Sequence, residues 1–164
     1  MASPSMVVLE ADHSRFMSIL DALRQEANSK FVFLMDKNGQ AIASSGVVGD
    51  TDQSALASLA AGNVAATEGL AALIGEDEFA TLFHEGRHDS LHLSLIANKV
   101  ILLVIFDEHS SLGLVRLRVE QRWPDLEAAV VEMMSRTQAT KTEASVPSAA
   151  IAEITDEDIE ALFG

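Results

Sequence analysis

Three histidines recur four residues apart, and their type and spacing could suggest a metal site. They are His84, His88 and His92. On a helix this spacing would place three imidazoles on one face, as in a zinc site. Gly86 and the alternating segment 90–96 place them instead in two strands joined by a turn, and four strand residues span about 13 Å. Because that span is too long for one metal ion, we expect ordinary surface or edge histidines and no bound metal.

No motif for catalysis or cofactor binding is present elsewhere in the chain. The P-loop, the Gly-x-Gly-x-x-Gly fingerprint and the Gly-x-Ser-x-Gly elbow are all absent. The chain has no cysteine, which excludes a thiol nucleophile, a disulfide scaffold and any Cys-ligated metal. The acid pairs Glu76/Glu78 and Asp107/Glu108 could serve as bases, but abundant acids are usually solvated. We therefore expect no catalytic residues, no cofactor and no enzymatic activity of the chain's own.

The composition limits the classes of partner. The 164 residues include 25 acidic and 11 basic ones, giving a net charge of -14. Nucleic acid and anionic membrane surfaces attract clustered Lys and Arg, so neither is an expected partner. The longest strongly apolar run, Val100–Phe106, is far shorter than the roughly 18 residues of a spanning helix. With no basic and apolar leader at the N-terminus, we expect a cytoplasmic protein without membrane insertion.

The elements expected to position any functional residues follow from hydrophobic periodicity. Spacings of three and four predict a helix from Ala11, and β-prone runs on either side of Asn38-Gly39 predict a hairpin. Residues 79–84, 90–96 and 100–106 are expected to form three further strands. A last helix is expected to begin at Ser110 or Ser111, with a possible kink at Pro124.

This order predicts an α/β fold, with helix, hairpin, helix, three strands and helix along the chain. Two groups of antiparallel strands joined by one crossover helix predict a mostly antiparallel five-stranded sheet with helices on both faces. The expected strand order is 2-1-5-4-3, with the last strand beside the first. We expect an N-terminal extension at 1–9, one domain at 10–135, a flexible linker at 136–150 and a tail at 151–164.

The crossover helix, residues 53–74, has an unusual composition. Thr51 or Asp52 is expected to cap its start and Gly75 to end it. Its large apolar residues are expected to form the core face; they are Leu56, Leu59, Leu70, Leu73 and Ile74. A second, small-residue stripe consists of Ala57, Ala61, Ala65, Gly69 and Ala72.

Two interpretations of this stripe remain open: it packs on the protein's own sheet, or it receives the backbone of another chain. The second is favoured because Gly62 and Gly69 each cost about 1 kcal/mol of helix stability relative to Ala, which close packing would offset.

The tail at 151–164 is acidic and amphipathic. From Glu143 onward the chain carries six acids and no base. The tail's apolar residues considered for docking are Ile154, Ile159, Leu162 and Phe163. An isolated amphipathic helix cannot bury its apolar side by itself. The tail is therefore expected either to dock in a groove on a partner or to remain packed on its own body or disordered.

Several segments together resemble the MglB family, bacterial Roadblock-domain regulators of the small Ras-like GTPase MglA. The segments are FVFLMDKNGQAIASSG, LASLAAGNVAATEGLAALIGEDEF, FHEG, DSLHLSLI, VILLVIFDEHSSLGLVRLR and IAEITDEDIEALF. The resemblance covers roughly residues 10–135 and the tail. It implies a Roadblock-type sandwich, a homodimer paired through the strand near 79–84 and the central helices, and a location in the cytoplasm and at a cell pole.

The resemblance also implies an activity and its sites. Family members accelerate GTP hydrolysis without an arginine finger, by moving the GTPase's own switch residues, and they act in cell polarity and motility. The GTPase platform would comprise Ala61, Asn63, Ala65, Glu68, Gly69 and Ala72. The dimer interface would comprise Ala57, Leu70, Phe79, Leu82 and Phe83. The tail would contact the GTPase and affect nucleotide exchange.

Three alternatives stay open beside this expectation. One is a Roadblock scaffold, or an exchange modulator, that binds a GTPase without accelerating hydrolysis. Another is a small-molecule-binding sandwich, which the mostly apolar strands disfavour. The third is a true arginine finger from Arg87, Arg116, Arg118 or Arg122, set aside because surface arginines on an acidic body usually balance charge.

Overall fold

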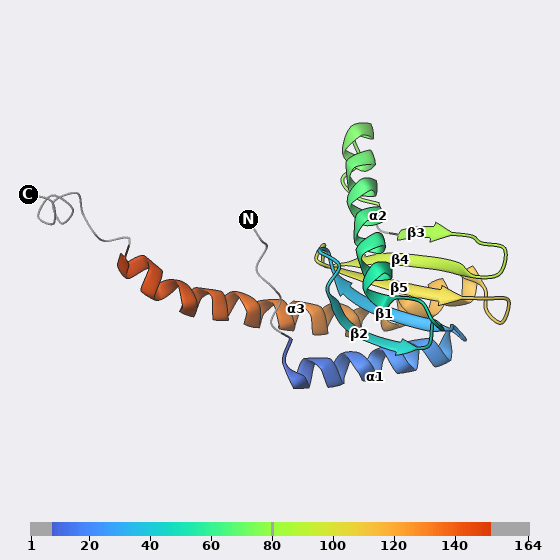
Figure 1. The fold of residues 1–164 in the computed structure, drawn as a ribbon, viewed down its shortest axis with the longest axis horizontal. Helices are drawn as coiled ribbons and strands as arrows, with labels where there is room; N and C mark the ends of the chain where they lie inside the picture. Colours follow the sequence, from blue (N-terminus) through green and yellow to red (C-terminus); the bar gives the residue numbers. More distant parts are fainter. Residues whose placement is uncertain (1–7, 80, 152–164) are drawn as a thin grey trace, which may run out of the picture.

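The computed structural model describes residues 8–79 and 81–151, which form a five-stranded sheet with helices on both faces (Figure 1). In chain order, the elements are α1 (Glu10–Glu26), β1 (Phe31–Asp36), β2 (Ala41–Gly46), α2 (Gln53–Ile74), β3 (Thr81–His84), β4 (Ser90–Ile96), β5 (Val100–Phe106) and α3 (Leu112–Ile151). The strand order is β2-β1-β5-β4-β3, with every neighbouring pair antiparallel. This confirms the predicted fold class, element order and strand order.

The β1–β2 hairpin turns where Asn38-Gly39 predicted it. The Asp36 carboxylate Oδ1 accepts hydrogen bonds from the backbone N–H groups of Asn38 and Gln40, both at 2.9 Å. Gly39 has a φ of +86°, which a residue with a side chain rarely adopts. A Cβ there would lie 3.2 Å from the Ala57 carbonyl oxygen, so the turn packs closely against α2.

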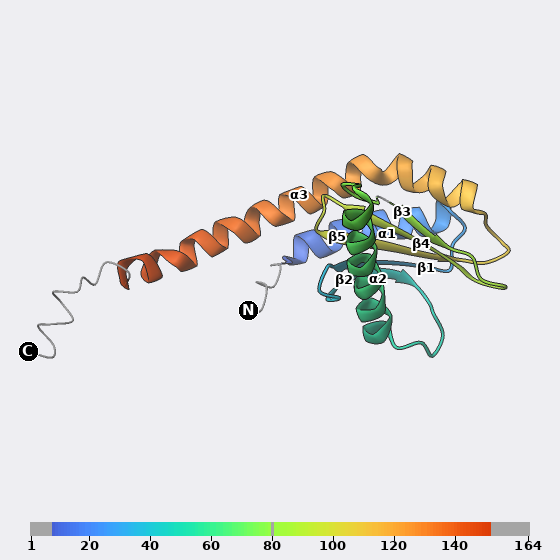
Figure 2. The same cartoon turned by 90° about the horizontal axis from the view of Figure 1, so that it is seen from above.

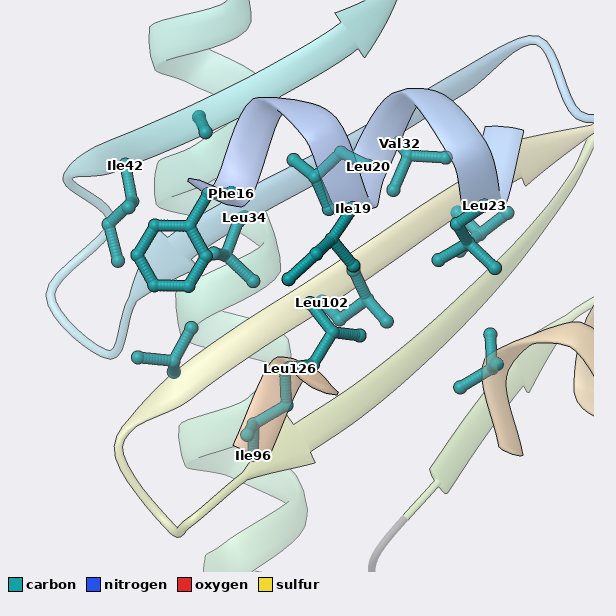
Figure 3. Packing of buried hydrophobic residues seen from close by; sticks show 14 of the residues in the cluster. Phe16, Ile19, Leu20, Leu23, Val32, Leu34, Ile42, Ile96, Leu102 and Leu126 are labelled. Carbon is teal, nitrogen blue, oxygen red and sulfur yellow. The ribbon is translucent and has the colours of Figure 1, made fainter. Parts of the chain in front are cut away.

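One hydrophobic core lies between the sheet and the pair α1 and α3. In Figure 3, Phe16, Ile19, Leu20 and Leu23 of α1 lie over sheet residues such as Leu34. The remaining large members come from β1, β2, β4, β5 and α3: Val32, Ile42, Ile96, Val100, Leu102, Val104, Phe106, Val115, Val119, Leu126, Val130 and Met133. Every residue of β1 and β5 is buried, as the continuous apolar run at 100–106 predicted.

A second core lies between the opposite face of the sheet and α2. The sheet contributes large side chains: Phe31, Phe33, Met35, Leu93, Leu95, Ile101, Leu103 and Ile105. From α2, the buried contributions are Ala57, Ala60, Ala61 and Val64. Large side chains on one layer thus meet small ones on the other, which brings the helix close to the sheet.

The ends of α2 lie where the sequence predicted them. The Asp52 carboxylate accepts from the N–H groups of Ser54 and Ala55, at 2.9 and 3.4 Å. Gly75 ends the helix in the left-handed region, with a φ of +79°. The helix crosses the strands, and its C-terminal part extends past β3, the last strand of the sheet (Figure 1).

α3 differs from the predicted helix and linker. Ser111 caps its start, accepting from the Leu114 N–H at 3.2 Å. The helix continues past Pro124 to Ile151, and its C-terminal half projects away from the sheet (Figures 1 and 2). The backbone of 136–150, expected to be a flexible linker, is therefore helical in the structure. Residues 136–146 contain neither Gly nor Pro, so no strong helix breaker interrupts the pattern there.

Candidate interaction surface

The side of α2 that faces the sheet is made of small residues. Ala57 is 1% exposed and Ala61 is 8% exposed, and both pack in the second core. Ala57 was expected at the dimer interface and Ala61 on the partner platform. The structure corrects both placements, because these side chains already contact the protein's own sheet.

The large apolar residues of α2 point away from the sheet, contrary to the expectation that they form its core face. Leu59 is 74% exposed, Leu70 59%, Leu73 84% and Ile74 67%. Of the five residues expected in that core face, only Leu56 is partly buried against the core. Within residues 8–79 and 81–151, α2 therefore presents an apolar face that no other part of the chain covers, over much of its length. Such a contiguous face typically marks a contact surface.

The small-residue stripe winds around the helix and does not lie flat on one side. A step of four residues turns an α-helix by roughly 40° beyond one full turn. The stripe therefore passes from the sheet side at Ala57 and Ala61 to the solvent side at Ala65 and Gly69. The first interpretation is confirmed for the first half, which packs on the sheet; the second half is exposed, and the approach of another chain there stays a prediction.

The exposed surface of α2 consists of two flanks separated by an open strip. The small flank is formed by Ala65, Gly69 and Ala72, and the large flank by Leu59, Leu70, Leu73 and Ile74; all seven are exposed. Gly62 lies in the strip between the two flanks. Gly69, a member of the small flank, lies at the border of the strip. A Cβ at either glycine would meet no atom within 4 Å. The described chain thus leaves room for another backbone to approach α2 closely.

Two side-chain contacts orient these flanks relative to the sheet. Asn63 Nδ2 lies 2.9 Å from His84 Nε2 at the end of β3, which ties the large flank to the sheet edge. Lys37 Nζ lies 2.6 Å from the Glu68 carboxylate, which ties the opposite side of α2 to the β1–β2 turn. Asn63 and Glu68, both expected on the platform, therefore already have partners in the single chain.

β3 forms one edge of the sheet beside this helix. Phe79, just before β3, and Phe83 within it are each 39% exposed. The Phe83 ring stacks on Phe106 with centroids 6.2 Å apart, and Leu82 packs partly against the second core. Three of the five residues expected at a dimer interface thus lie at the sheet edge, with Leu82 on the α2 side and Phe83 on the α3 side. The tail residues Ile154, Ile159, Leu162 and Phe163 lie outside the described residues.

The histidines are dispersed, as predicted from their placement in two strands joined by a turn. One of them, however, is not a surface residue. His84 ends β3 and His88 lies in the turn before β4, whereas His92 is only 2% exposed. Burial and the nearby Arg116 charge lower the pKa of His92 to about 4, so its imidazole is neutral near pH 7. The expectation of surface or edge histidines is wrong for His92. The alternation in SLHLSLI was a signal for it, because His92 lies on the face opposite the leucines. In residues 8–79 and 81–151, no three His, Asp or Glu side chains gather where they could hold a metal ion.

α2 is also the one helix among the described residues whose length and apolar composition would suit a membrane span, with a mean hydropathy of 1.3. A helix packed in the core of a globular domain meets the same criterion. The burial of Ala57, Ala60, Ala61 and Val64 against the sheet explains part of this composition.

The fold and the exposed helix can be compared with known proteins. The Roadblock/LC7 domain profile matches residues 17–106, which spans the sheet, α2 and most of α1. The chain belongs to the Roadblock/LC7 family. Within the family it is similar to MglB from Myxococcus xanthus, with 47% identity over 77% of this chain and 96% of that one, at a TM-score of 0.73.

Two further MglB structures are also similar to the chain. The gliding protein MglB from Thermus thermophilus shares 29% identity over 80% of this chain and 99% of its own, with a TM-score of 0.74. A structure described as MglB with tetrameric arrangement shares 28% identity over 80% of this chain and 99% of its own, with a TM-score of 0.75. None of the curated protein sequences compared with the chain matches it.

Proposed function

We propose that this protein is a homodimeric GTPase-activating protein for a small Ras-like GTPase of the MglA type. The observation that carries the proposal is the exposed face of α2, with four large apolar side chains between 59% and 84% exposed beside two glycines open to solvent. The similarity to MglB structures supports the proposal, and the class of partner is the one that the resemblance to the MglB family implies. A role in cell polarity and motility, in the cytoplasm and at a cell pole, belongs to the same proposal.

The dimer in this proposal forms through β3 and the large flank of α2. β3 lies at the edge of the sheet, and a free edge strand presents unpaired N–H and C=O groups that a second copy can extend. The contact between Asn63 and His84 places the large flank on the same side as this edge. Pairing two copies there would cover Leu70, Phe79 and Phe83 together.

The GTPase platform in this proposal is the small flank, formed by Ala65, Gly69 and Ala72. These residues stay exposed when the large flank is covered by a second copy, and their short side chains allow a partner's backbone to approach. Glu68 borders the flank and neutralises Lys37 at 2.6 Å. Ala61 is left out because it is buried.

The proposed mechanism needs no catalytic residue from this chain. An arginine finger can contribute a rate factor of about 10³–10⁵. Of the four arginines considered, Arg122 is already engaged by Glu26, with Nε 3.0 Å from Oε2. Arg116, Arg118 and Arg122 all lie on α3, which packs on the face of the sheet opposite α2. Activation from the platform would therefore act by repositioning the GTPase's own catalytic groups.

The test is single-turnover GTP hydrolysis by an MglA-type GTPase, with and without this protein. Ala65→Arg with Gly69→Arg places bulk and charge on the platform and should abolish the acceleration. A matched control is Gly113→Arg with Ala128→Arg, one glycine and one alanine that are exposed on α3; this variant should activate normally. Normal acceleration of GTP hydrolysis by the platform variant would refute the assignment of the platform to the small flank.

The alternative function is a scaffold or exchange modulator, and the same experiment separates it. A scaffold would bind the GTPase loaded with a GTP analogue and leave the hydrolysis rate unchanged. A chain that ends at residue 151 lacks the tail and therefore shows what the tail contributes. If the truncated chain still accelerates hydrolysis, activation would be assigned to α2. The tail would then keep only the proposed effect on nucleotide exchange.

A further inference from the structure

A buried polar pair interrupts the hydrophobic core on the face of the sheet opposite α2. Leu91, Leu93 and Leu95 of β4 face α2, so His92 and Ser94 face α3. They are 2% and 4% exposed. Their neighbours on the same face of β5 are apolar, since His92 pairs with Val104 and Ser94 with Leu102. A histidine and a serine at core positions call for a partner.

The described residues supply few hydrogen-bond partners for the side chains of His92 and Ser94. His92 Nδ1 lies 3.4 Å from Ser94 Oγ, at the long limit for a hydrogen bond. Among the described residues, this is the only side-chain hydrogen bond of His92. A buried polar group is normally paired; His92 Nε2 is not among the buried side-chain atoms without a partner, so this nitrogen is open to the space beside it. The neutral imidazole retains one N–H donor and one acceptor.

A cavity of about 270 Å³ lies where these two side chains face α3. Thr81 of the edge strand lines one side. Val119 and Trp123 of α3 supply apolar wall, and Arg116 and Glu120 supply charge. Thr81, Arg116 and Glu120 are exposed, so the cavity opens to solvent at this rim. Its volume lies just below the range of pockets for drug-sized ligands, which indicates a smaller molecule.

The charges at the rim select the kind of ligand. None of the ion pairs among the described residues includes Arg116, so its guanidinium is available for a bidentate contact with a carboxylate. Ser94 and Thr81 add hydroxyl donors. Glu120 would repel a second negative charge. Val119 and Trp123 can cover an apolar body.

We propose that this cavity is a binding site for a small monocarboxylate with a planar or aliphatic body. Arg116 holds the carboxylate, His92 and Ser94 hydrogen-bond to it, and Trp123 and Val119 contact the apolar part. The site lies across the sheet from the α2 platform, and its rim residue Thr81 lies on β3, the strand of the proposed dimer; the proposal does not depend on GTPase activation.

The probe for the test is benzoate, added to the full-length protein while the His92 imidazole signals are followed by NMR. Benzoate should shift these signals saturably. It should also raise the pKa of His92, because a bound anion offsets the nearby Arg116 charge; Glu120 is the other charged group at the cavity. Benzamide, which has the same shape and no charge, and inorganic phosphate, which carries more charge, should give no saturable shift.

Three exposed substitutions test the assignment of the rim. Arg116→Gln should weaken benzoate binding about tenfold or more, since it removes a charge-assisted contact. Glu120→Gln should tighten binding a fewfold. Arg87→Gln is the control for the loss of one positive charge, since Arg87 does not line this cavity, and it should bind as the unchanged protein does.

The NMR spectra also show whether each variant is folded. The proposal is overturned by a benzoate shift at His92 that is absent or not saturable, or by equal binding of benzamide or phosphate. It is also overturned if folded Arg116→Gln binds benzoate normally, or if Glu120→Gln binds it no more tightly.

Discussion

Replacing Gly62 and Gly69 of α2 by alanine should make the isolated chain more stable. Neither glycine has a positive φ, and a Cβ at either position meets no atom within 4 Å. An exposed Gly→Ala change in a helix interior contributes about 0.8–1 kcal/mol. The sites are separate enough for their effects to add, giving about 2 kcal/mol together.

The same two methyl groups should weaken the proposed activity. If another helix packs against the open strip of α2, two added Cβ atoms hold it away, so GTPase activation should fall about tenfold or more. Stability and activity then move in opposite directions. A general folding defect would lower both, so this combination is specific to a close contact at α2.

The assays are urea and thermal unfolding at two protein concentrations and single-turnover GTP hydrolysis. For a protein of this size, 2 kcal/mol corresponds to a rise in Tm of about 4–8 °C. Working at low concentration separates the stability of the single chain from that of a dimer. Gly113→Ala is the matched control, because Gly113 is an exposed helical glycine of α3 with nothing within 4 Å. It should leave activation unchanged.

Two results would refute this reasoning separately. Unchanged or lower stability at both concentrations would mean that the glycine face of α2 is already covered within the chain. Higher stability with full activation would mean that the face is open but is not the contact surface. The second result would move the platform away from α2 and leave the fold as described.

Three further substitutions test other contacts. Asp52→Ala removes the α2 cap and should lower the free energy of unfolding by about 1 kcal/mol, measured by urea unfolding. Gly46→Ala should cost about 2 kcal/mol or more, because Gly46 has a φ of +102° and a Cβ would lie 2.2 Å from the Lys30 carbonyl oxygen; a normal Tm would contradict this. The hydrogen bond from Arg122 lowers the pKa of Glu26, so this pair stabilises the fold above the unfolded pKa and less as the pH falls below it. Arg122→Gln should therefore lower stability by up to about 1 kcal/mol at pH 7 and by less at pH 3.

The fold was predictable because its signals are local and repeated. Alternation in 90–96 identified a strand, the continuous apolar run in 100–106 identified the central strand, and Asn38-Gly39 identified the hairpin. Asp52 and Gly75 fixed the ends of α2. Each of these depends on backbone geometry that a few neighbouring residues determine.

The orientation of α2 was not predictable in the same way, because it depends on the surface it packs against. Hydrophobicity alone favours burying the leucines. The sheet presents Phe31, Phe33 and other large side chains on this face, and it leaves room only for small residues on the helix. The extent of α3 was missed for a related reason: composition suggested a linker at 136–150, while the absence of Gly or Pro up to residue 146 let the helix continue.

This choice of helix face connects the packing to the proposed function. Close packing of Ala57 and Ala61 against large sheet residues stabilises the single chain and at the same time turns Leu59, Leu70 and Leu73 outward. If α2 were rotated to bury its leucines, the helix would have to move away from the sheet, and the outer face would be small and polar. The arrangement observed keeps a tight core only by leaving an apolar surface exposed. Among the described residues nothing covers that surface, which is the physical reason to expect association with a second chain at α2.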